Sequence, residues 1–222
     1  MVTAVIFDWD GTLAETKKAV VESFQKVLTD VGCKVTDQFL LRLMGVGTRN
    51  TIIQALEQCN MPYDEELLVG LIKEKVRIQT ELTGLVELFE GATELLAALK
   101  GRTKIALATM SGRKVINKVL KEKGIRQYFD AVVTANEVTK PKPDPEVFQV
   151  AATELKVNPE DCVVIEDSVF GVQAAKTAKM RCIAIPSGVY SAEELGKENP
   201  DMLVSSLAET KKILSFVFGN SA

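Results

Sequence analysis

Histidine is absent from all 222 residues of the chain. Its absence excludes Ser-His-Asp and Cys-His catalytic groups as well as His-rich zinc sites. Any acid–base chemistry near neutral pH must therefore come from carboxylates, lysine, tyrosine or a metal-bound water.

The chain also lacks an excess of either charge and any long apolar run. Lys and Arg total 27 against 30 for Asp and Glu, so the formal net charge is −3. This balance gives no electrostatic reason to expect nucleic acid or an anionic membrane as the main partner. No segment approaches the apolar length of a membrane span, and the first residues, MVTAVIF, lack the features of a signal peptide. We therefore expect a cytoplasmic protein with an ordinary packed core.

Cysteine is scarce, and its four copies are widely spaced along the chain. Cys33, Cys59, Cys162 and Cys182 include no CxxC pair. In a cytoplasm we expect such residues to be reduced thiols that pack in the core.

What the sequence does contain is an alternation of short apolar runs with helical patterns. Runs rich in Val, Ile and Ala predict strands, and amphipathic stretches between them predict helices. The predicted strands cover residues 2–7, 104–108, 131–134, 162–165 and 181–185, and two of the predicted helices cover residues 112–123 and 145–155. This order predicts a doubly wound, Rossmann-like α/β fold with a parallel sheet.

The alternation breaks between residues 15 and 85, where the pattern is helical throughout. We interpret residues 15–85 as an all-helical insert in a core that comprises residues 1–14 and 86–222. The charged run KEK at residues 73–75, inside this insert, is interpreted as a solvated helix face.

Polar side chains follow the predicted strands at the points where the strands end. They are Asp8, Asp10, Thr109, Ser111, Lys140, Lys142, Glu166, Asp167 and Ser168. In an open parallel sheet the carboxyl ends of the strands share one edge, and ligands bind there. Asp8 and Asp10, at positions i and i+2, would repel each other unless a cation or a proton relieved them.

These residue types suit a phosphoryl group together with Mg²⁺. Mg²⁺ prefers oxygen ligands, which Asp8 and Asp167 can provide with Glu166 close by. Backbone N–H groups at a helix N-terminus and the Thr109 hydroxyl suit an anionic oxygen, and an aspartate can itself attack phosphorus. Taken singly, each feature also has a structural explanation. Acids at a helix N-terminus interact favourably with the helix dipole, and Thr109 and Ser111 can be N-caps.

Four segments, in order, resemble the signature motifs of the haloacid dehalogenase superfamily, in its aspartate-nucleophile phosphatase branch. They are FDWDGTL at residues 7–13, ALATMS at 106–111, KPDPEVF at 142–148 and VVIEDS at 163–168. Their order and their spread over nearly the whole chain make the resemblance far more specific than any single motif. It implies that the helical insert is the small cap of this family.

The resemblance also implies a role for each residue of these motifs. Asp8 would be the nucleophile and Asp10 the general acid and base. Thr109, with Met110 beside it, would bind the transferring phosphoryl group, and Lys142 would bind it and balance its charge. The implied ligands of the Mg²⁺ cofactor are Asp8, the Asp10 carbonyl, Glu166 and Asp167.

Substrate choice is expected to depend on the insert, where MGVGTRNTI spans residues 44–52. Gly45 and Gly47 can let a loop come close to the site. Arg49 can bind a substrate phosphate or carboxylate with two N–H groups, or it can be an exposed arginine at a helix start. The Gly-Val-Gly loop resembles that of phosphoglycolate phosphatases, and Thr48–Arg49 is similar to the Ser-Arg of β-phosphoglucomutases. Those mutases also use a histidine shortly after the first motif, and this chain has none.

We therefore predict a Mg²⁺-dependent phosphatase that hydrolyses a small phosphate monoester, phosphoglycolate-like or a sugar phosphate, through an aspartyl-phosphate. Its partner would be a small phosphorylated metabolite, not nucleic acid or membrane, and the protein would be a monomer or a weak dimer. Two alternatives stay open: a β-phosphoglucomutase-like phosphotransferase and a non-enzymatic binder of a phosphate ligand. The missing histidine argues against the mutase, and the complete motif set argues against the binder.

Overall fold

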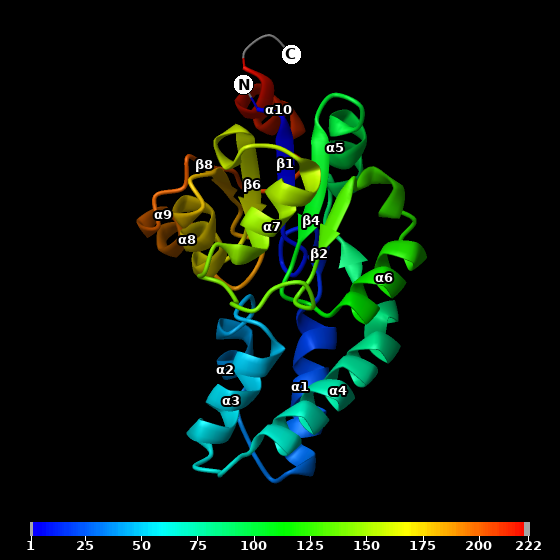
Figure 1. Cartoon of the computed structure of the whole chain (residues 1–222), viewed down its shortest axis with the longest axis vertical. Coiled ribbons are helices and arrows are strands. Elements are labelled where there is room, and N and C mark those ends of the chain that lie inside the picture. Colours follow the sequence, from blue (N-terminus) through cyan, green and yellow to red (C-terminus); the bar gives the residue numbers. More distant parts are fainter. Residues whose placement is uncertain (1, 220–222) are drawn as a thin grey trace.

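The computed structural model describes residues 2–219. Figure 1 shows two parts: a sheet with helices around it, near which the chain starts and ends, and a group of helices at one end of the strands. The inserted helices follow the first strand, and strands and helices alternate after them. The predicted α/β fold with an all-helical insert is therefore confirmed.

Neighbouring strands of the main sheet all run parallel, in the order β5–β4–β1–β6–β7–β8. They are β1 (Ala4–Phe7), β4 (Lys104–Ala108), β5 (Ala131–Val133), β6 (Cys162–Glu166), β7 (Arg181–Ala184) and β8 (Met202–Leu203). The predicted strands are all present, whereas β8 is too short to show a pattern in the sequence. The strand order reverses at β1, and in such sheets ligands bind where the order reverses.

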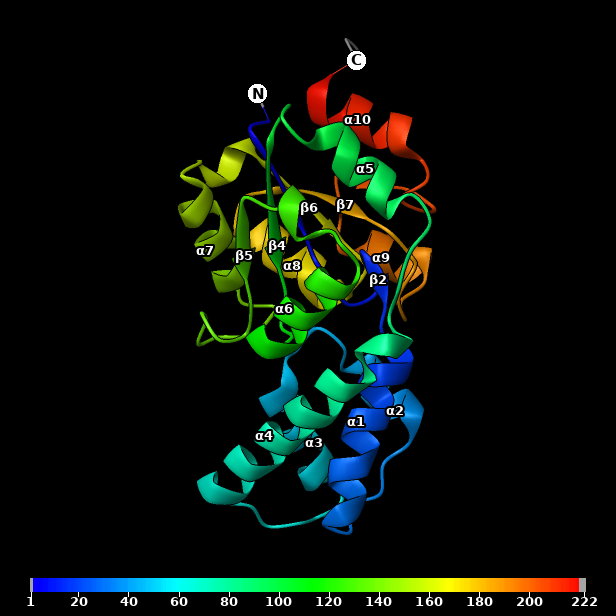
Figure 2. The ribbon, with the colours of Figure 1, turned by 90° about the vertical axis from the view of Figure 1, so that its right-hand side faces the viewer.

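Helices cover both faces of this sheet (Figure 2). They are α5 (Ala92–Leu99), α6 (Arg113–Glu122), α7 (Glu146–Leu155), α8 (Val169–Thr177), α9 (Ala192–Lys197) and α10 (Thr210–Phe218). Side chains along β1 point alternately to the two faces. Val5 and Phe7 pack with α5, α6 and α10, whereas Ala4 and Ile6 pack with α7 and α8. Burial on both faces fixes the position of the residues that follow β1.

The inserted helices have an apolar core of their own. They are α1 (Lys17–Asp30), α2 (Asp37–Arg42), α3 (Thr48–Gln58) and α4 (Glu65–Glu81). Phe24, Leu40, Ile52 and Leu68, one from each helix, are at most 4% exposed. An antiparallel ribbon of β2 (Ala14–Glu15) and β3 (Glu87–Leu88) joins the insert to the sheet. The exact boundaries at residues 15 and 85 stay a prediction. Short 3₁₀ helices occur at η1 (Leu82–Leu85), η2 (Arg126–Tyr128) and η3 (Pro159–Asp161).

The prediction of four reduced thiols is wrong for one pair of cysteines. Cys33 and Cys59 form a disulfide within the insert, with their Cα atoms 5.6 Å apart. Cys33 lies just after α1 and Cys59 ends α3, so the packing of the insert brings together residues 26 positions apart. Spacing in the sequence does not reveal such a pairing. Cys162 and Cys182 are free and buried, as predicted.

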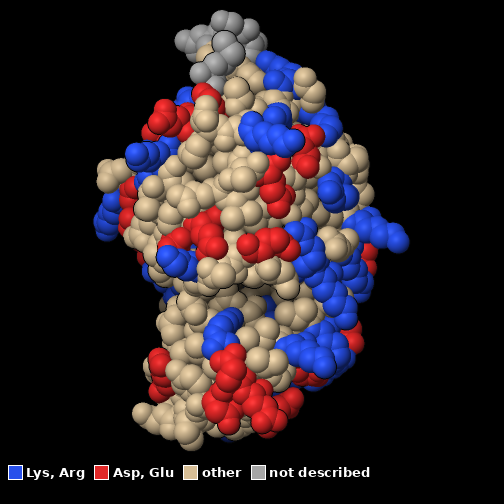
Figure 3. All heavy atoms as spheres, in the orientation of Figure 1, with Lys and Arg blue, Asp and Glu red and all other residues tan. Residues whose placement is uncertain are grey.

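Neither sign of charge dominates the face in Figure 3, although acidic side chains gather at the end of the helical part far from the sheet. Within residues 2–219, no helix combines the length and the apolar character that a membrane span requires. The cytoplasmic location and the state of a monomer or weak dimer stay predictions. The disulfide is more usual in an oxidising compartment than in a cytoplasm.

Candidate active site

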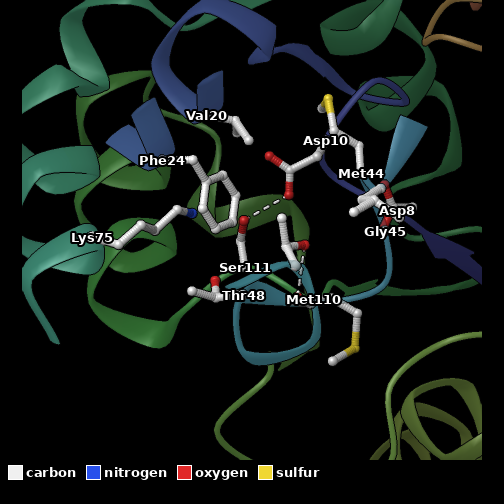
Figure 4. A pocket seen from close by; sticks show the side chains of 13 residues that line it. Asp8, Asp10, Val20, Phe24, Met44, Gly45, Thr48, Lys75, Met110 and Ser111 are labelled. Carbon is white, nitrogen blue, oxygen red and sulfur yellow. Dashed lines mark hydrogen bonds between the residues drawn. The ribbon is translucent and has the colours of Figure 1, made fainter. Parts of the chain in front are cut away.

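Strand β1 brings two acidic side chains to the carboxyl edge of the sheet. Asp8 continues the strand, because its backbone N–H donates to the Ile165 carbonyl of β6 at 3.1 Å. Trp9 is only 1% exposed and belongs to the apolar core cluster on the face of the sheet covered by α5, α6 and α10. Successive side chains of an extended chain alternate in direction. Burial of Trp9 therefore leaves Asp8 and Asp10 to line the same cavity (Figure 4).

Lys142 lies between two of the predicted acids. Its Nζ donates to Asp8 Oδ1 at 2.6 Å and to Glu166 Oε1 at 2.5 Å, and its side chain is fully buried. Burial alone would lower the pKa of Lys142, but the negative charges of Asp8 and Glu166 outweigh burial and raise it. The ammonium is therefore charged at neutral pH and balances part of the acidic charge.

Glu166 and Asp167 are held by hydrogen bonds at the start of α8. Glu166 Oε2 accepts from the backbone N–H groups of Asp167 and Ser168, each at 2.9 Å. The Thr12 hydroxyl donates to Asp167 Oδ1, also at 2.9 Å. A Cβ on Gly11 would collide with the Asp167 carboxylate, and Gly11 has a φ of +90°. Glycine is therefore required where the first motif turns beside the fourth.

Asp8, Glu166 and Asp167 form an acidic cluster that fits a divalent cation. One carboxylate oxygen from each lies within 4.8 Å of the others, and all three residues are buried. Burial raises the pKa of both Asp8 and Asp167, and the neighbouring acids add to this effect while Lys142 opposes it. A bound cation would relieve the remaining repulsion. Oxygen ligands of this kind suit Mg²⁺, and this ligand set, with the Asp10 carbonyl, stays a proposal.

Asp10 is held by two hydroxyl groups that follow β4. Its Oδ2 accepts from Ser111 Oγ at 2.7 Å, as drawn in Figure 4, and from Thr109 Oγ1 at 3.3 Å. The N-cap of α6 is Gly112, so neither hydroxyl caps that helix. Asp10 Oδ1 is buried without a hydrogen-bond partner among residues 2–219. A buried oxygen of this kind at a cavity is suited to exchange a proton with a ligand.

The acids open onto a small cavity between the sheet and the insert (Figure 4). Its volume is about 40 Å³, and its walls include Val20, Phe24 and Met44 from the insert and Met110 from the core. Gly47 lies at the edge of this cavity with a φ of +87°, and a Cβ there would come within 3.3 Å of Met110 Cε. The glycine loop therefore lies directly against the site.

The interpretation of residues 73–75 as a solvated helix face is wrong for Lys75. This lysine is only 3% exposed and lines the cavity that Asp8 and Asp10 also line. Its Nζ lies 4.3 Å from the centroid of the Phe24 ring and donates to Gln79 Oε1 at 2.6 Å. Burial lowers the pKa of Lys75 to about 8, although the charge of Asp10 opposes the shift.

The sequence did carry a signal for the burial of Lys75. Leu68, Leu71, Lys75 and Ile78 are all buried positions of α4. Their spacing of three and four residues places them on one face of the helix. The apolar stripe, and not the run of charges, was the pattern that indicated where this lysine lies.

The structure does not bring Arg49 to the cavity beside Asp8. Its guanidinium donates to both carboxylate oxygens of Glu65, at 2.8 and 2.6 Å, and its side chain is 47% exposed. Arg49 instead lines a neighbouring cavity of about 320 Å³ between the insert and the core, which shares Gly47 and Met110 with the first. A role for Arg49 in substrate binding stays a prediction. The structure brings together the other predicted site residues, Asp8, Asp10, Thr109, Met110, Lys142, Glu166 and Asp167.

Comparison with known proteins agrees with the resemblance seen in the motifs. The sequence profile of the haloacid dehalogenase-like hydrolases matches residues 5–185. A phosphorylated carbohydrates phosphatase of Thermotoga maritima is 32% identical over 214 residues, 96% of this chain and 96% of that protein. The fructose-1-phosphate phosphatase of Escherichia coli is 34% identical over 182 residues, 82% of this chain and 95% of that one. A β-phosphoglucomutase of Clostridium difficile has a similar structure, with a TM-score of 0.87 at 29% identity, covering 97% of this chain and 96% of that one.

Proposed function

The chain belongs to the haloacid dehalogenase-like hydrolase family and is a phosphoric monoester hydrolase, and we infer that it hydrolyses a small phosphate monoester with the aid of Mg²⁺. The named activities of the two phosphatases favour a sugar phosphate, and the small cavity at Asp8 favours a compact, phosphoglycolate-like ester. The observation that carries this proposal is the buried Lys142 between Asp8 and Glu166. An ammonium in this position can offset part of the negative charge of the acids and of an incoming phosphate.

In the proposed reaction, Asp8 attacks phosphorus. A bond forms between an Asp8 carboxylate oxygen and phosphorus as the bond from phosphorus to the ester oxygen breaks, which gives an aspartyl-phosphate. Lys142 donates to Asp8 Oδ1 and favours the ionised carboxylate that the attack requires. Thr109, fully buried at the end of β4, would hold the transferring group.

Asp10 would carry the proton in both halves of the reaction. The leaving ester oxygen needs a proton, and Asp10 Oδ1, which has no partner among the described residues, is free to deliver it. Ser111 and Thr109 hold the other oxygen of the same carboxylate. In the second half, Asp10 would take a proton from the water that hydrolyses the aspartyl-phosphate, which restores Asp8 and releases phosphate.

The acidic cluster would hold Mg²⁺ through Asp8, Glu166 and Asp167, with the Asp10 carbonyl. When bound, Mg²⁺ supplies positive charge to the phosphoryl oxygens, where negative charge has to be stabilised during transfer. Glu166 also accepts from Lys142 and from two backbone N–H groups. It therefore fixes the lysine beside the residues that would hold the cation.

A phosphotransferase of the β-phosphoglucomutase type is the second candidate, because a β-phosphoglucomutase shares the fold over nearly the whole chain. Such an enzyme must protect its aspartyl-phosphate from water until a sugar accepts the phosphoryl group. The cavity wall contributed by α1 consists of Val20 and Phe24, neither of which can exchange a proton with a sugar hydroxyl. Conversion of β-glucose 1-phosphate to glucose 6-phosphate without net release of phosphate would favour the mutase over the phosphatase.

A phosphate-release screen over small phosphate esters tests the proposal. We expect release that needs Mg²⁺, stops in excess chelator and is inhibited by Ca²⁺, whose looser coordination disturbs the in-line geometry. The variant Asp167→Ala should need more Mg²⁺ for the same rate. Full activity in excess chelator would contradict the role of the metal, and no release from any ester in the presence of Mg²⁺ would contradict the phosphatase.

A further inference from the structure

Lys75 differs from the other cationic side chain of the site because it contacts no acid. Among residues 2–219 it forms no ion pair, and its Nζ contacts the ring of Phe24 and the amide oxygen of Gln79. Both partners stabilise a cation without neutralising it. We propose that Gln79 and Phe24 position the Lys75 ammonium to bind a second anionic group of the substrate. This inference rests on the proposed phosphatase function and narrows its substrate class.

Lys75 is a buried ammonium with few compensating contacts. A buried charge is destabilising unless an opposite charge or hydrogen bonds compensate for it. Lys75 is only 3% exposed, and among the residues that the structure describes a single amide oxygen accepts a hydrogen bond from its Nζ. An ammonium has three N–H donors, so the arrangement leaves it able to accept a further ligand. Since Lys75 lines the cavity, a substrate can reach it.

Gln79 is suited to hold this ammonium without neutralising it. It lies one helical turn after Lys75 on the same face of α4 and is 3% exposed. Figure 4 shows the nitrogen of Lys75 directed toward the Phe24 ring, from the opposite side of the cavity to Met110. A glutamate at position 79 would be nearly the same size as glutamine but would form an ion pair with Lys75. The neutrality of Gln79 therefore leaves the charge of Lys75 for the substrate.

The cavity also limits how far apart the two anions of the substrate can be. Its volume is about 40 Å³; Val20, Phe24 and Met44 line it with apolar surface, and Thr48 and Thr51 add only neutral hydroxyls. Asp10 lines the same cavity and would repel an anion near it, so the anion is placed at the Lys75 end. These constraints favour a phosphate ester with a carboxylate or a second phosphate on a short carbon chain.

Two substrates that differ in one anion test the inference. 2-Phosphoglycolate and 2-hydroxyethyl phosphate have the same number of carbons, but only the first has a carboxylate. We expect the wild-type protein to prefer phosphoglycolate by roughly ten- to a hundredfold in kcat/KM, the effect of one charge-assisted contact. Lys75→Met and Gln79→Glu should both remove most of this preference, mainly by raising KM for phosphoglycolate and not by lowering kcat.

A matched control comes from the same helix. Lys73 is an exposed lysine of α4, two residues before Lys75, and Lys73→Met should keep the full preference. Lys75→Met removes a buried charge in favour of an apolar side chain of similar size, so the variant is expected to fold. Thermal unfolding of each variant checks this point.

The outcomes separate this inference from the proposed function. If the wild-type protein releases phosphate from both esters at similar kcat/KM, or only from neutral sugar phosphates, the inference is overturned and the phosphatase stands. If Gln79→Glu slows both esters equally, Gln79 supports the fold of the insert and does not position Lys75 for an anion. If no ester releases phosphate, the proposed function fails and the inference fails with it.

Discussion

Two buried lysines, one in each part of the molecule, have opposite surroundings. Lys142, in the core, donates to Asp8 and Glu166, and their charges raise its pKa despite its burial. Lys75, in the insert, contacts an aromatic ring and an amide, and its burial lowers its pKa to about 8. The same side chain is therefore a permanent cation in one part and a cation of adjustable charge in the other.

This difference indicates how the two parts divide the work. The core holds Lys142 between two acids of its own, so the position of this lysine does not depend on a substrate. The insert leaves one charge unbalanced, and only a ligand with negative charge can balance it. The chemistry would then belong to the core, and the choice of substrate to the insert.

The largest expected effect comes from replacing the proposed nucleophile of the core. Asp8→Asn should lower turnover by about a millionfold, or about 8 kcal/mol of barrier, because an amide does not attack phosphorus. The fold should survive, since Lys142 keeps its bond to Glu166. Single-turnover phosphate release by a highly purified sample measures the effect. A rate within tenfold of the wild type would exclude the covalent mechanism.

A second experiment removes the balancing charge from the core. Lys142→Met should lower the free energy of unfolding by about 3–5 kcal/mol at neutral pH, because it leaves Asp8 and Glu166 buried without their cation. Without the ammonium, the folded-state pKa of Asp8, which burial already raises, rises further above the unfolded value, so the folded state binds more protons. The loss should therefore shrink as pH falls.

Chemical denaturation at two pH values measures this effect, with Lys140→Met as the control. The side chain of Lys140 is 71% exposed, and its Nζ forms an ion pair with Asp144 at 3.8 Å. The control should be close to the wild type at both pH values. Equal stability of Lys142→Met and the control would mean that Lys142 does not compensate the acids.

A third experiment changes the charge of Lys75, in the insert, by changing the pH. Lys75 is an ammonium below its pKa of about 8 and a neutral amine above it. The kcat/KM for phosphoglycolate should therefore fall about tenfold as pH rises through 8, and the kcat/KM for hydroxyethyl phosphate should not. Asp8 and Asp10 are the acids that face the same cavity, and they act equally on both esters. Lys75→Met should abolish the difference between the two pH profiles of kcat/KM. A difference that persists would mean that another group causes the pH dependence.

The fold and the core of the site could be predicted from the sequence because both depend on local patterns. Alternating apolar runs mark the strands, and the residues directly after each strand must meet at one edge of a parallel sheet. Asp8, Thr109 and Glu166 are therefore brought together by topology alone. No knowledge of side-chain packing was needed to predict that they meet.

The insert could not be predicted to the same depth. Its helices are visible in the sequence, but the angles at which they pack are not. The contact of Lys75 with Phe24 and the disulfide of Cys33 with Cys59 both depend on that packing. The stripe of α4 did indicate that Lys75 is buried. The ion pair of Arg49 with Glu65 joins the start of α3 to the start of α4, and no pattern in the sequence predicts it.

The smallest expected effect concerns Arg49, which the sequence offers either as a residue that binds a substrate phosphate or carboxylate or as an exposed arginine at a helix start. Its guanidinium is already paired with Glu65 and is largely in solvent, so Arg49→Ala should change kcat/KM by less than about fivefold, and equally for both esters. The matched variant Glu65→Ala, which frees Arg49 from its partner, should have as small an effect. A tenfold or larger rise in KM for phosphoglycolate alone on Arg49→Ala would contradict this expectation. It would mean that the insert moves to bring Arg49 to the substrate, and that Lys75 is not the main receptor for the second anion.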